Sequence, residues 1–470
     1  MRQRILRHPV AGWSDPAIAF AALHGGAANA FWLDGGAHAA SGMSYIGAGN
    51  QVATGSVPHN TVTLAPGGQV VDGTIFDFLR GQPVLTDEAV GAPLGWVGWL
   101  GYELRTQTMP GHESAAVGIR PRVSRYPDAA LLRIDRLVAF DHAAGSVHLI
   151  ALGDAWSGEL ARWRDSTVAS LASLAGLSVL SNPGAADASD PLAPVAATAV
   201  RWRDTDEEYL AKIAACQLAI VEGEAYQLCL TTEVAVDVHP DPLATWLKLR
   251  RASPSHHGGF LRIGDVSLLS SSPEQFLSLD RAGVLESRPI KGTRPRGANR
   301  ADDDRLRSEL AASEKERAEN LMIVDLMRND LGRVCEVGSV GVPSLLRVES
   351  YAQVHQLVST VRGRLAADRD AIEAIEACFP AGSMTGAPKL RATELLDTLE
   401  ARPRGLYSGA FGYVGFDGGL DLAMVIRSIV LDADGATIGT GGGITALSVP
   451  AEELEEMKLK AAALLRVLGV

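Results

Sequence analysis

The chain has 470 residues, a length at which one simple hydrophobic core usually gives way to two lobes or one large composite domain. Its hydrophobic content of 47% is that of a globular protein and argues against extensive disorder. The net charge of −12, from 43 basic and 55 acidic residues, argues against broad binding to nucleic acid or to an anionic membrane.

The cysteines and the N-terminal residues indicate the cellular compartment in which the protein is expected. No Cys-x-x-Cys pair occurs, so neither a zinc site nor a disulfide framework is predicted, and reduced thiols are expected for Cys216, Cys229, Cys335 and Cys378. Residues 1–8 lack the apolar run of a signal peptide, and no apolar run is long enough to span a bilayer. These features predict a cytoplasmic protein.

The first part of the chain, residues 1–180, is predicted to be rich in β-strand. Short β-rich runs alternate with glycine-rich turns at residues 94–102, 130–140 and 146–152, which is typical of an antiparallel sheet. Residues 154–174 predict a helix. Residues 181–200 are rich in Ala, Pro, Asp and Ser, and they form the predicted linker to the second part, residues 201–470.

The second part mixes helices with strands. One helix is predicted over 206–222 with Asp204 or Thr205 as its N-cap, and another over 450–467 beginning at Pro450. Helices are also predicted at 301–331 and 371–379, and strands at 227–236, 266–269, 274–279, 406–416 and 420–431, the last two as a hairpin. Helices combined with mainly antiparallel strands predict an α+β fold.

Lys291 stands between an apolar residue and a glycine in Pro-Ile-Lys-Gly-Thr, and it is a candidate nucleophile. Glu274, in Ser-Ser-Ser-Pro-Glu, is a candidate acid. A lysine, an acid and paired carboxylates in one chain suggest enzyme chemistry on a small anionic molecule, which an acidic protein can bind only through a local cationic pocket or a metal. The alternative for Lys291 is an ordinary surface lysine in a turn.

Two predicted helices carry pairs of glutamates. Glu316 and Glu319 lie three residues apart on one helical face, just before an apolar run, and carboxylates there suit a hard cation such as Mg²⁺. Glu453, Glu456 and Lys460 likewise share one face of the last helix. The alternative in both places is a solvated helix face with ordinary Glu–Lys pairs.

Other segments are weaker signals. The run Thr-Gly-Gly-Gly-Ile at 440–444, which contains Gly442 and Gly443, lets backbone N–H groups approach an anion, or is a plain turn. Arg427 suits a bidentate carboxylate contact or a structural salt bridge. Thr385 lies in a turn-rich segment that opens a helix, and His355, taken alone, is more often a structural histidine.

Taken together and in order, these segments resemble the chorismate-utilising enzymes over residues 203–469. The resemblance rests on Gly-Glu-Ala-Tyr-Gln-Leu at 223–228, Ser-Ser-Pro-Glu-Gln-Phe at 271–276, Pro-Ile-Lys-Gly-Thr at 289–293, Glu-Asn-Leu-Met-Ile-Val-Asp-Leu at 319–326, Met-Thr-Gly-Ala-Pro-Lys at 384–389 and the glycine run with its following helix. Residues 31–34 and 95–102 match more loosely. The resemblance implies an anthranilate synthase component I-like fold, an antiparallel β-sandwich with helices packed outside and both parts of the chain in one composite sandwich.

Two positions sort the members of this family. Gln227 stands where isochorismate and salicylate synthases carry a water-activating lysine, so an ammonia-using member is favoured. Lys291 stands where anthranilate synthases usually have alanine, and lysine there is the mark of the aminodeoxychorismate synthase branch. An anthranilate synthase large subunit is the alternative enzyme. A chorismate-binding subunit without catalysis would be expected to have lost these acids and the lysine.

The resemblance also implies a role for each residue. Glu319 and Glu456 would hold Mg²⁺, supported by Glu316 and Glu453. Lys291, as a neutral amine of lowered pKa, would add at C2 of chorismate while Glu274 protonates the leaving C4 hydroxyl. Ammonia would then attack C4 and expel Lys291 from C2. Positions that bind the substrate carboxylates are Arg427, Tyr407, Lys460, Gly442 and Gly443, and pocket positions are His355 and Thr385.

The source of ammonia and the regulation are the remaining expectations. No glutaminase nucleophile elbow surrounds any cysteine, so a separate glutamine amidotransferase subunit is the implied partner. Family members often bind tryptophan through a Leu-Leu-Glu-Ser-like motif and an Asn-Pro-x-Pro-Tyr segment. Here residues 33–36 and 252–256 lack the serine and the tyrosine of these motifs, so tryptophan binding is in doubt.

Overall fold

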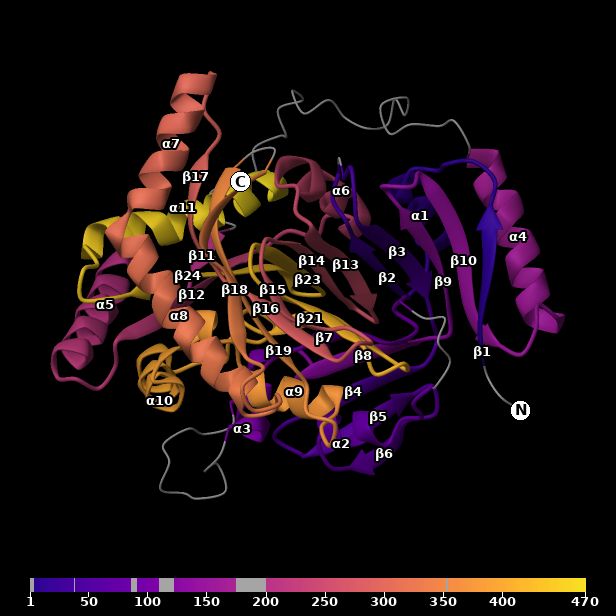
Figure 1. Ribbon diagram of the computed structural model, residues 1–470, viewed down its shortest axis with the longest axis horizontal. Coiled ribbons are helices and arrows are strands. Elements are labelled where there is room, and N and C mark those ends of the chain that lie inside the picture. Colours follow the sequence, from indigo (N-terminus) through magenta and orange to yellow (C-terminus); the bar gives the residue numbers. More distant parts are fainter. Residues whose placement is uncertain (1–3, 38, 86–90, 110–121, 175–199, 352–353) are drawn as a thin grey trace.

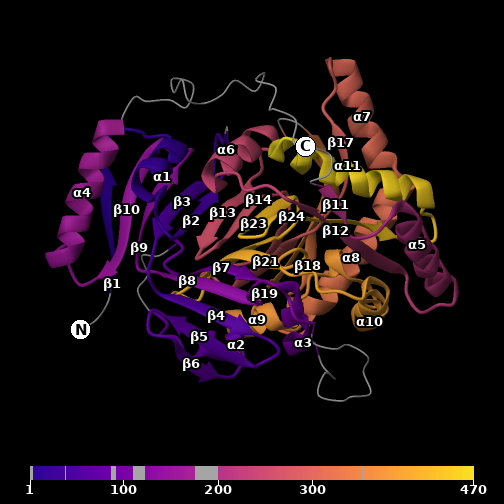
Figure 2. The same ribbon diagram turned by 180° about the vertical axis from the view of Figure 1, so that it is seen from behind.

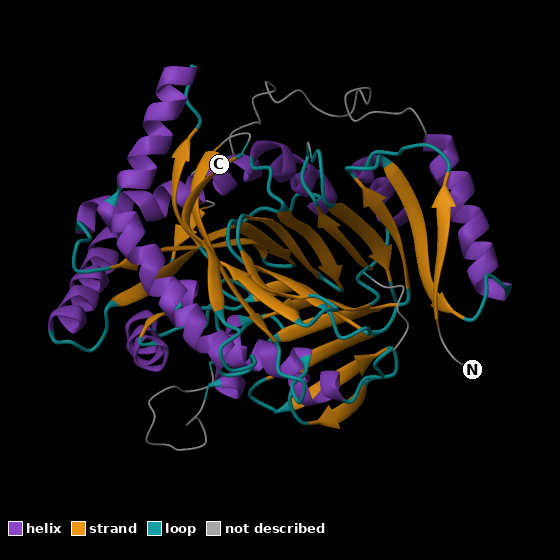
Figure 3. Ribbon diagram, in the orientation of Figure 1, coloured by secondary structure: helices purple, strands orange, loops and turns teal. Residues whose placement is uncertain are grey.

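Two large antiparallel sheets face each other and carry helices on their outer sides (Figure 1, Figure 3). The computed structural model describes residues 4–37, 39–85, 91–109, 122–174, 200–351 and 354–470. Apolar side chains from both sheets, among them Phe31, Leu268, Val97 and Leu132, form one buried core. The predicted α+β fold, an antiparallel sandwich with outer helices, is confirmed.

The strands of both sheets come from both parts of the chain. The first sheet runs β1 (Arg4–Val10), β10 (Ser146–Gly153), β9 (Arg136–Asp141), β3 (Met43–Ala48), β2 (Asn29–Asp34), β13 (His257–Ile263), β14 (Val266–Ser272), β23 (Ser428–Asp432), β24 (Gly435–Ile444), β12 (Gln227–Val236) and β11 (Val200–Trp202), with β20 (Gly386–Ala387) beside β12. Pairing of Trp32 with Phe260 joins β2 to β13.

The second sheet is built in the same composite way. Its order is β17 (Ile290–Pro295), β19 (Val354–Arg364), β16 (Val284–Arg288), β15 (Gln275–Leu279), β22 (Leu420–Met424), β21 (Ala410–Gly415), β7 (Gly95–Leu100), β8 (Ala129–Ile134), β4 (Val52–Ser56), β5 (Thr61–Ala65) and β6 (Gln69–Asp72), with β18 (Gly341–Ser350) beside β19. Pairing of Trp99 with Phe411 joins β7 to β21. The predicted linker 181–200 lies outside the described residues except for Val200.

The helices bury apolar faces against the outer sides of the sheets. Packed with the first sheet are α1 (Pro16–His24), α4 (Gly158–Leu174), α5 (Asp206–Val221), α6 (Pro242–Ala252), α10 (Lys389–Glu400) and α11 (Pro450–Leu468). Packed with the second are α2 (Ile75–Arg80), α8 (Glu314–Gly332) and α9 (Ala371–Cys378), while α7 (Arg300–Ala312) extends beyond it (Figure 1). Three shorter helical elements are η1 (Tyr102–Leu104), α3 (Arg105–Thr108) and η4 (Gly382–Met384).

Several predicted elements are confirmed, because their signals are local. The side chain of Thr205 accepts a hydrogen bond from the backbone N–H of Glu208, so it is the N-cap of α5. The predicted strand 227–236 is β12, and the terminal helix begins at Pro450 as expected. None of the described helices is long and apolar enough to cross a membrane.

Other predicted elements are divided in the structure. The predicted helix 301–331 is two helices, because Ser313 takes an extended conformation (ψ 112°) and its hydroxyl caps the N-terminus of α8. The run 130–140 is two strands in opposite sheets, β8 and β9, which separate at Asp135. The run 420–431 breaks in the same way: β22 pairs with β21 as the predicted hairpin, but β23 lies in the other sheet.

Candidate active site

Most of the predicted site residues, though not His355 and Thr385 by their contacts, gather at one end of the sandwich. There α8 and α11 lie beside β17 of one sheet and β12 and β24 of the other (Figure 1, Figure 2). The glycines of β24 mark the meeting point. A Cβ added to Gly443 would lie 2.5 Å from Nε2 of Gln227 and 3.3 Å from Oε2 of Glu319. One added to Gly442 would lie 3.1 Å from Oε2 of Glu453. The polar ends of these three side chains therefore lie directly against the strand at Gly442 and Gly443.

Lys291 lies on β17, with its ammonium Nζ 3.9 Å from Oε2 of Glu319, and both side chains are largely buried. Burial by itself lowers the pKa of Lys291, but the charges of Glu319, Cys229, Glu274 and Glu316 together outweigh it and raise the pKa above the usual lysine value. The sequence led us to expect a lowered pKa for Lys291. The protein's own charges raise this pKa instead, so that expectation is wrong. The sequence pattern identified the lysine but not the carboxylates that surround it.

Gly292 explains why a glycine follows this lysine. Its φ is +82°, and an added Cβ would lie 2.8 Å from Cδ1 of Leu310 and 2.9 Å from the carboxylate of Glu316. The glycine thus turns the strand and lets the first turn of α8 approach it closely.

Gly292→Ala is expected to lower the free energy of unfolding by about 2 kcal/mol, from left-handed strain plus the contact with Leu310 and Glu316. Gly283 is a matched control, since its φ is +76° but an added Cβ would meet nothing within 4 Å. Gly283→Ala should lose only about 1 kcal/mol, measured by urea denaturation. Equal losses in the two variants would mean that Gly292 matters for its backbone conformation alone.

Glu274 lies between β14 and β15 and is 6% exposed. Burial raises its pKa to about 7, although the nearby Ser383 hydroxyl and the charge of Lys291 lower it. Ser383 lies beside this carboxyl without reaching the geometry of a full hydrogen bond. A carboxyl group with this pKa can hold a proton near neutral pH and give it up during a reaction. Ser383 was not predicted as a site residue; its place two residues before Thr385 was the only available signal.

Gln227 is the first residue of β12 and is completely buried. Among the residues that the structure describes, neither the nitrogen nor the oxygen of its side-chain amide has a hydrogen-bond partner. A buried amide left in this way costs free energy, so its retention points to a ligand that satisfies it. The amide faces Gly443 and is therefore directed at the meeting point of α8 and β24.

Each of the four predicted metal carboxylates is near a basic side chain. The nitrogen-to-oxygen distances are 3.5 Å for Arg294–Glu316, 3.9 Å for Lys291–Glu319, 2.7 Å for Lys315–Glu453 and 2.8 Å for Lys460–Glu456. Among the described residues, no three carboxylate, imidazole or thiol groups are gathered closely enough to enclose a metal. Mg²⁺ usually takes one or two carboxylates, with waters and substrate oxygens as its other ligands. Hard oxygen ligands from two helices, beside the unpartnered amide of Gln227, fit such an open site.

Arg427 is the clearest candidate for binding an anion. It lies between β22 and β23 with φ +51°, and its half-buried side chain forms no hydrogen bond or ion pair with any residue that the structure describes. Burial lowers its pKa, partly offset by Tyr407 and Glu456. Tyr407 packs against Gly439, where an added Cβ would overlap its ring. Lys460, besides its pair with Glu456, donates a hydrogen bond to the carbonyl oxygen of Gly441.

His355 and Thr385 have partners within the protein. The ring nitrogens of His355 contact Oγ of Ser350 at 2.8 Å and Oδ1 of Asp303 at 3.0 Å. The hydroxyl of Thr385 donates to the carbonyl oxygens of Ala381 and Gly382 in its own turn. These contacts do not connect either residue to Lys291, and their predicted place in a substrate pocket remains a prediction.

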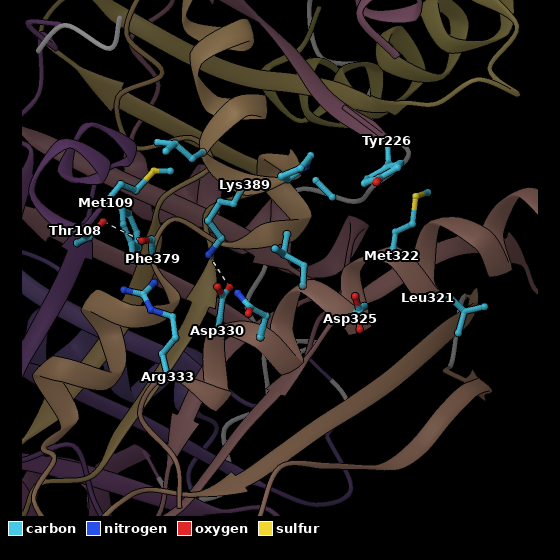
Figure 4. Close-up of a pocket in the computed structure, with 15 residues that line it drawn as sticks. Thr108, Met109, Tyr226, Leu321, Met322, Asp325, Asp330, Arg333, Phe379 and Lys389 are labelled. Carbon is cyan, nitrogen blue, oxygen red and sulfur yellow. Dashed lines mark hydrogen bonds and ion pairs between the residues drawn. The ribbon is translucent and has the colours of Figure 1, made fainter. Parts of the chain in front are cut away.

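A cavity of about 690 Å³ is lined by residues of α8 that follow Glu319 in the chain (Figure 4). It is lined by Leu321, Met322 and other residues of α8 and by the segment around Lys389, whose Nζ donates to Asp330. Tyr226, next to Gln227 in the chain, also lines it. None of the predicted site residues does, so the cavity adjoins the candidate site and is separate from it.

Known proteins are similar to this chain over most of its length. The family model described as "chorismate binding enzyme" matches residues 29–466. The chain is 42% identical over 467 residues to the aminodeoxychorismate synthase of Streptomyces pristinaespiralis, covering 95% of this chain but 63% of that one. It therefore spans less than two thirds of the length of this relative. It is 36% identical over 486 residues to anthranilate synthase component 1 of Mycolicibacterium smegmatis, covering 99% of this chain and 90% of that one.

A solved structure supports the same assignment of the fold. Anthranilate synthase component I from Streptococcus pneumoniae TIGR4 superposes with a TM-score of 0.74 at 27% identity. The match covers 90% of this chain and 92% of that chain. The predicted anthranilate synthase component I-like fold is confirmed.

Proposed function

Because this chain belongs to the family of chorismate binding enzymes, we propose that it aminates chorismate at C4 with ammonia and forms 4-amino-4-deoxychorismate. This product would serve 4-aminobenzoate and folate synthesis in the cytoplasm. The observation that carries the proposal is the position of Lys291, which is largely buried 3.9 Å from the carboxylate of Glu319 and whose charge also interacts with that of Glu274. The similarity to aminodeoxychorismate synthases over most of the chain supports it.

In this proposal the substrate is held by cationic side chains. Chorismate carries two carboxylates, and the unpartnered guanidinium of Arg427 offers a bidentate contact to one of them. Lys460 and Gly442 lie on the α11 side of the site, and Gly443 lies beside Gln227 and Glu319. Glu319 and Glu456, with Glu316 and Glu453 beside them, would hold Mg²⁺. When bound, Mg²⁺ would neutralise the ring carboxylate and draw electron density from the ring.

The reaction requires a nucleophile and an acid. Lys291 would add to C2 as a neutral amine while the bond from C4 to its hydroxyl breaks. Glu274 would donate its proton to that leaving hydroxyl, and the product is water. Ammonia would then attack C4 and expel the amine of Lys291 from C2, which leaves the amino group where the hydroxyl was. The pKa of Lys291 is raised by the protein's own charges, so the neutral amine must be produced in the bound complex.

Ammonia would come from a separate glutamine amidotransferase. A glutaminase uses a cysteine thiolate, and burial raises the pKa of all four thiols here, to about 12 for Cys216 and about 11 for Cys335. None of them is therefore a ready nucleophile.

The product identifies the activity. Purified chain would be incubated with chorismate, Mg²⁺ and an ammonium salt at alkaline pH, and the product analysed by mass. Conversion to 4-aminobenzoate by added aminodeoxychorismate lyase is the expected result. Anthranilate formed without the lyase would instead support the second candidate, an anthranilate synthase large subunit, which the relative from Mycolicibacterium smegmatis favours.

Arg427→Met is expected to raise the KM for chorismate by about 10- to 100-fold, because a hydrogen bond to a charged group contributes about 1.5–3 kcal/mol. The free energy of unfolding should hardly change, since no protein partner of the guanidinium is lost. Arg362→Met removes a surface pair with Glu286 and should leave the KM unchanged. An unchanged KM in Arg427→Met would exclude the contact with substrate.

A further inference from the structure

Lys315 joins the two helices that carry the metal-type carboxylates. It lies in the first turn of α8, and its Nζ donates to Oε1 of Glu453, in the first turn of α11, at 2.7 Å. The hydroxyl of Ser448 donates to the same oxygen at 2.6 Å. Glu453 is only 2% exposed, so this carboxylate depends on these two partners.

The ammonium of Lys315 also acts beyond Glu453. Its charge interacts with those of Glu319 on α8 and Glu456 on α11. One cationic side chain thus lies among three carboxylates from two helices, where a divalent cation would give the same compensation of charge. The unpartnered amide of Gln227 borders this group through Gly443 and Glu319, and it independently points to a ligand at this place.

Three of the four basic side chains at the site, those other than Lys291, differ in how firmly hydrogen bonds hold them. Lys460 is fixed by a second hydrogen bond to the carbonyl oxygen of Gly441. The guanidinium of Arg294 also bonds the carbonyl of Thr293 and the carboxylate of Glu309. Glu453 is the single hydrogen-bond partner of the Lys315 ammonium among the described residues, and the side chain is one-third exposed. A flexible lysine stem can therefore carry this ammonium into solvent without breaking any other contact.

We propose that Lys315 is the resident counter-ion of this site and that a divalent metal displaces its ammonium from Glu453 when it binds. The inference rests on the Mg²⁺ site of the proposed function and adds to it the residue that sets metal affinity. Each carboxylate is drawn to its own basic partner, which accounts for the lack of a closed three-ligand group among the described residues. Release of the Lys315 pair frees an oxygen of Glu453 at the junction of α8 and α11.

The first test measures metal binding directly. Mn²⁺ would be titrated into the purified chain and followed by electron paramagnetic resonance of the free ion, with Mg²⁺ competition. Lys315→Met should bind Mn²⁺ about tenfold more tightly or better, since a competing ammonium is removed. Lys458→Met is the matched control. It also removes one lysine charge, but this lysine lies on α11 and pairs with Asp206 on the surface. Its affinity should stay within about twofold of the parent.

The second test uses the unmodified sequence and so does not depend on the folding of a variant. A low dose of an amine acetylating reagent would be applied with and without Mg²⁺, and modification of each lysine followed by mass spectrometry. Modification of Lys315 should become several-fold faster with Mg²⁺ while that of Lys458 stays constant.

The outcomes separate the inference from the proposed function. If the parent binds Mn²⁺ but Lys315→Met binds no more tightly than Lys458→Met, or if Mg²⁺ leaves the labelling of Lys315 unchanged, the counter-ion role is overturned and the Mg²⁺ site stands. If neither the parent nor the variants bind Mn²⁺, with or without chorismate, the Mg²⁺ site itself fails and the inference fails with it.

Discussion

Lys291→Ala is expected to lower the formation of 4-amino-4-deoxychorismate by about 10⁴-fold or more, the scale of loss seen when a nucleophile is removed. The amine that is proposed to add to C2 is absent in this variant, and no other lysine side chain is paired with Glu319 among the described residues. Arg427, Lys460 and the glutamates are untouched, so chorismate and Mg²⁺ should still bind. Because the resemblance places alanine here in anthranilate synthases, any remaining product is expected to be anthranilate.

Rapid-quench product analysis and calorimetric binding of chorismate together check this prediction. Lys458→Ala, which removes a lysine of α11 that pairs with Asp206, is the control and should keep full activity. Trapping a mass increase on Lys291 in the parent would give direct support for the covalent adduct. Turnover of Lys291→Ala within about tenfold of the parent would rule out the nucleophile, since a covalent step contributes far more than that.

Glu274→Gln is expected to lower turnover by about 10²- to 10⁴-fold, because the glutamine amide keeps the shape of the side chain but has no acidic proton to donate. If Glu274 is the proposed acid, the active form of the parent is the protonated one, so turnover should decrease as the pH rises through about 7, the pKa to which burial raises Glu274. The variant should lack this decrease. Rates must be compared at constant free ammonia, whose own ionisation otherwise changes in the same range.

Glu274→Gln, which is expected to lower turnover, is expected to raise the free energy of unfolding at high pH. The pKa of Glu274 is raised from 4.5 to about 7 in the folded chain, so between these values the unfolded chain releases the proton and the folded chain keeps it. Stability from this group is complete below pH 4.5 and is lost as the pH rises through about 7. At 1.36 kcal/mol per unit of pKa, the loss is about 3 kcal/mol.

Glu274→Gln should therefore be more stable than the parent at pH 8, by up to about 3 kcal/mol, and similar to it near pH 4.5. Urea denaturation at the two pH values measures the difference. Glu309→Gln, at a half-exposed position on α7, is the control and should show no such dependence. A parent and a Glu274→Gln variant with parallel pH profiles would mean that Glu274 ionises as an exposed carboxyl does.

Greater stability together with lower activity would identify Glu274 as a residue kept for chemistry. In that case its carboxyl would be buried at a cost in stability because its proton is needed in the proposed reaction. Glu453 offers a contrast: it is also buried, but Lys315 and Ser448 compensate its charge.

Local signals in the sequence were sufficient for many elements. The N-cap at Thr205, the strand 227–236 and the helix beginning at Pro450 depend on residues within a few positions of one another, and all three are confirmed. The antiparallel α+β class follows from the same local patterns. Where a strand-like run changes sheets, as at Asp135 and before Ser428, periodicity continues across the break and could not show it.

For the candidate site, too, some features follow from the sequence and others only from the tertiary structure. The sequence alone determined which residue types stand in the motifs around Lys291, Glu274, Gln227 and Glu319, and so the family. Only the tertiary structure decided their surroundings. The raised pKa of Lys291, the pKa of about 7 at Glu274 and the pairing of Lys315 with Glu453 across two helices all arise between residues far apart in the chain. Charge interactions and desolvation depend on distance in space and on burial, and neither quantity is contained in the spacing of residues along a sequence.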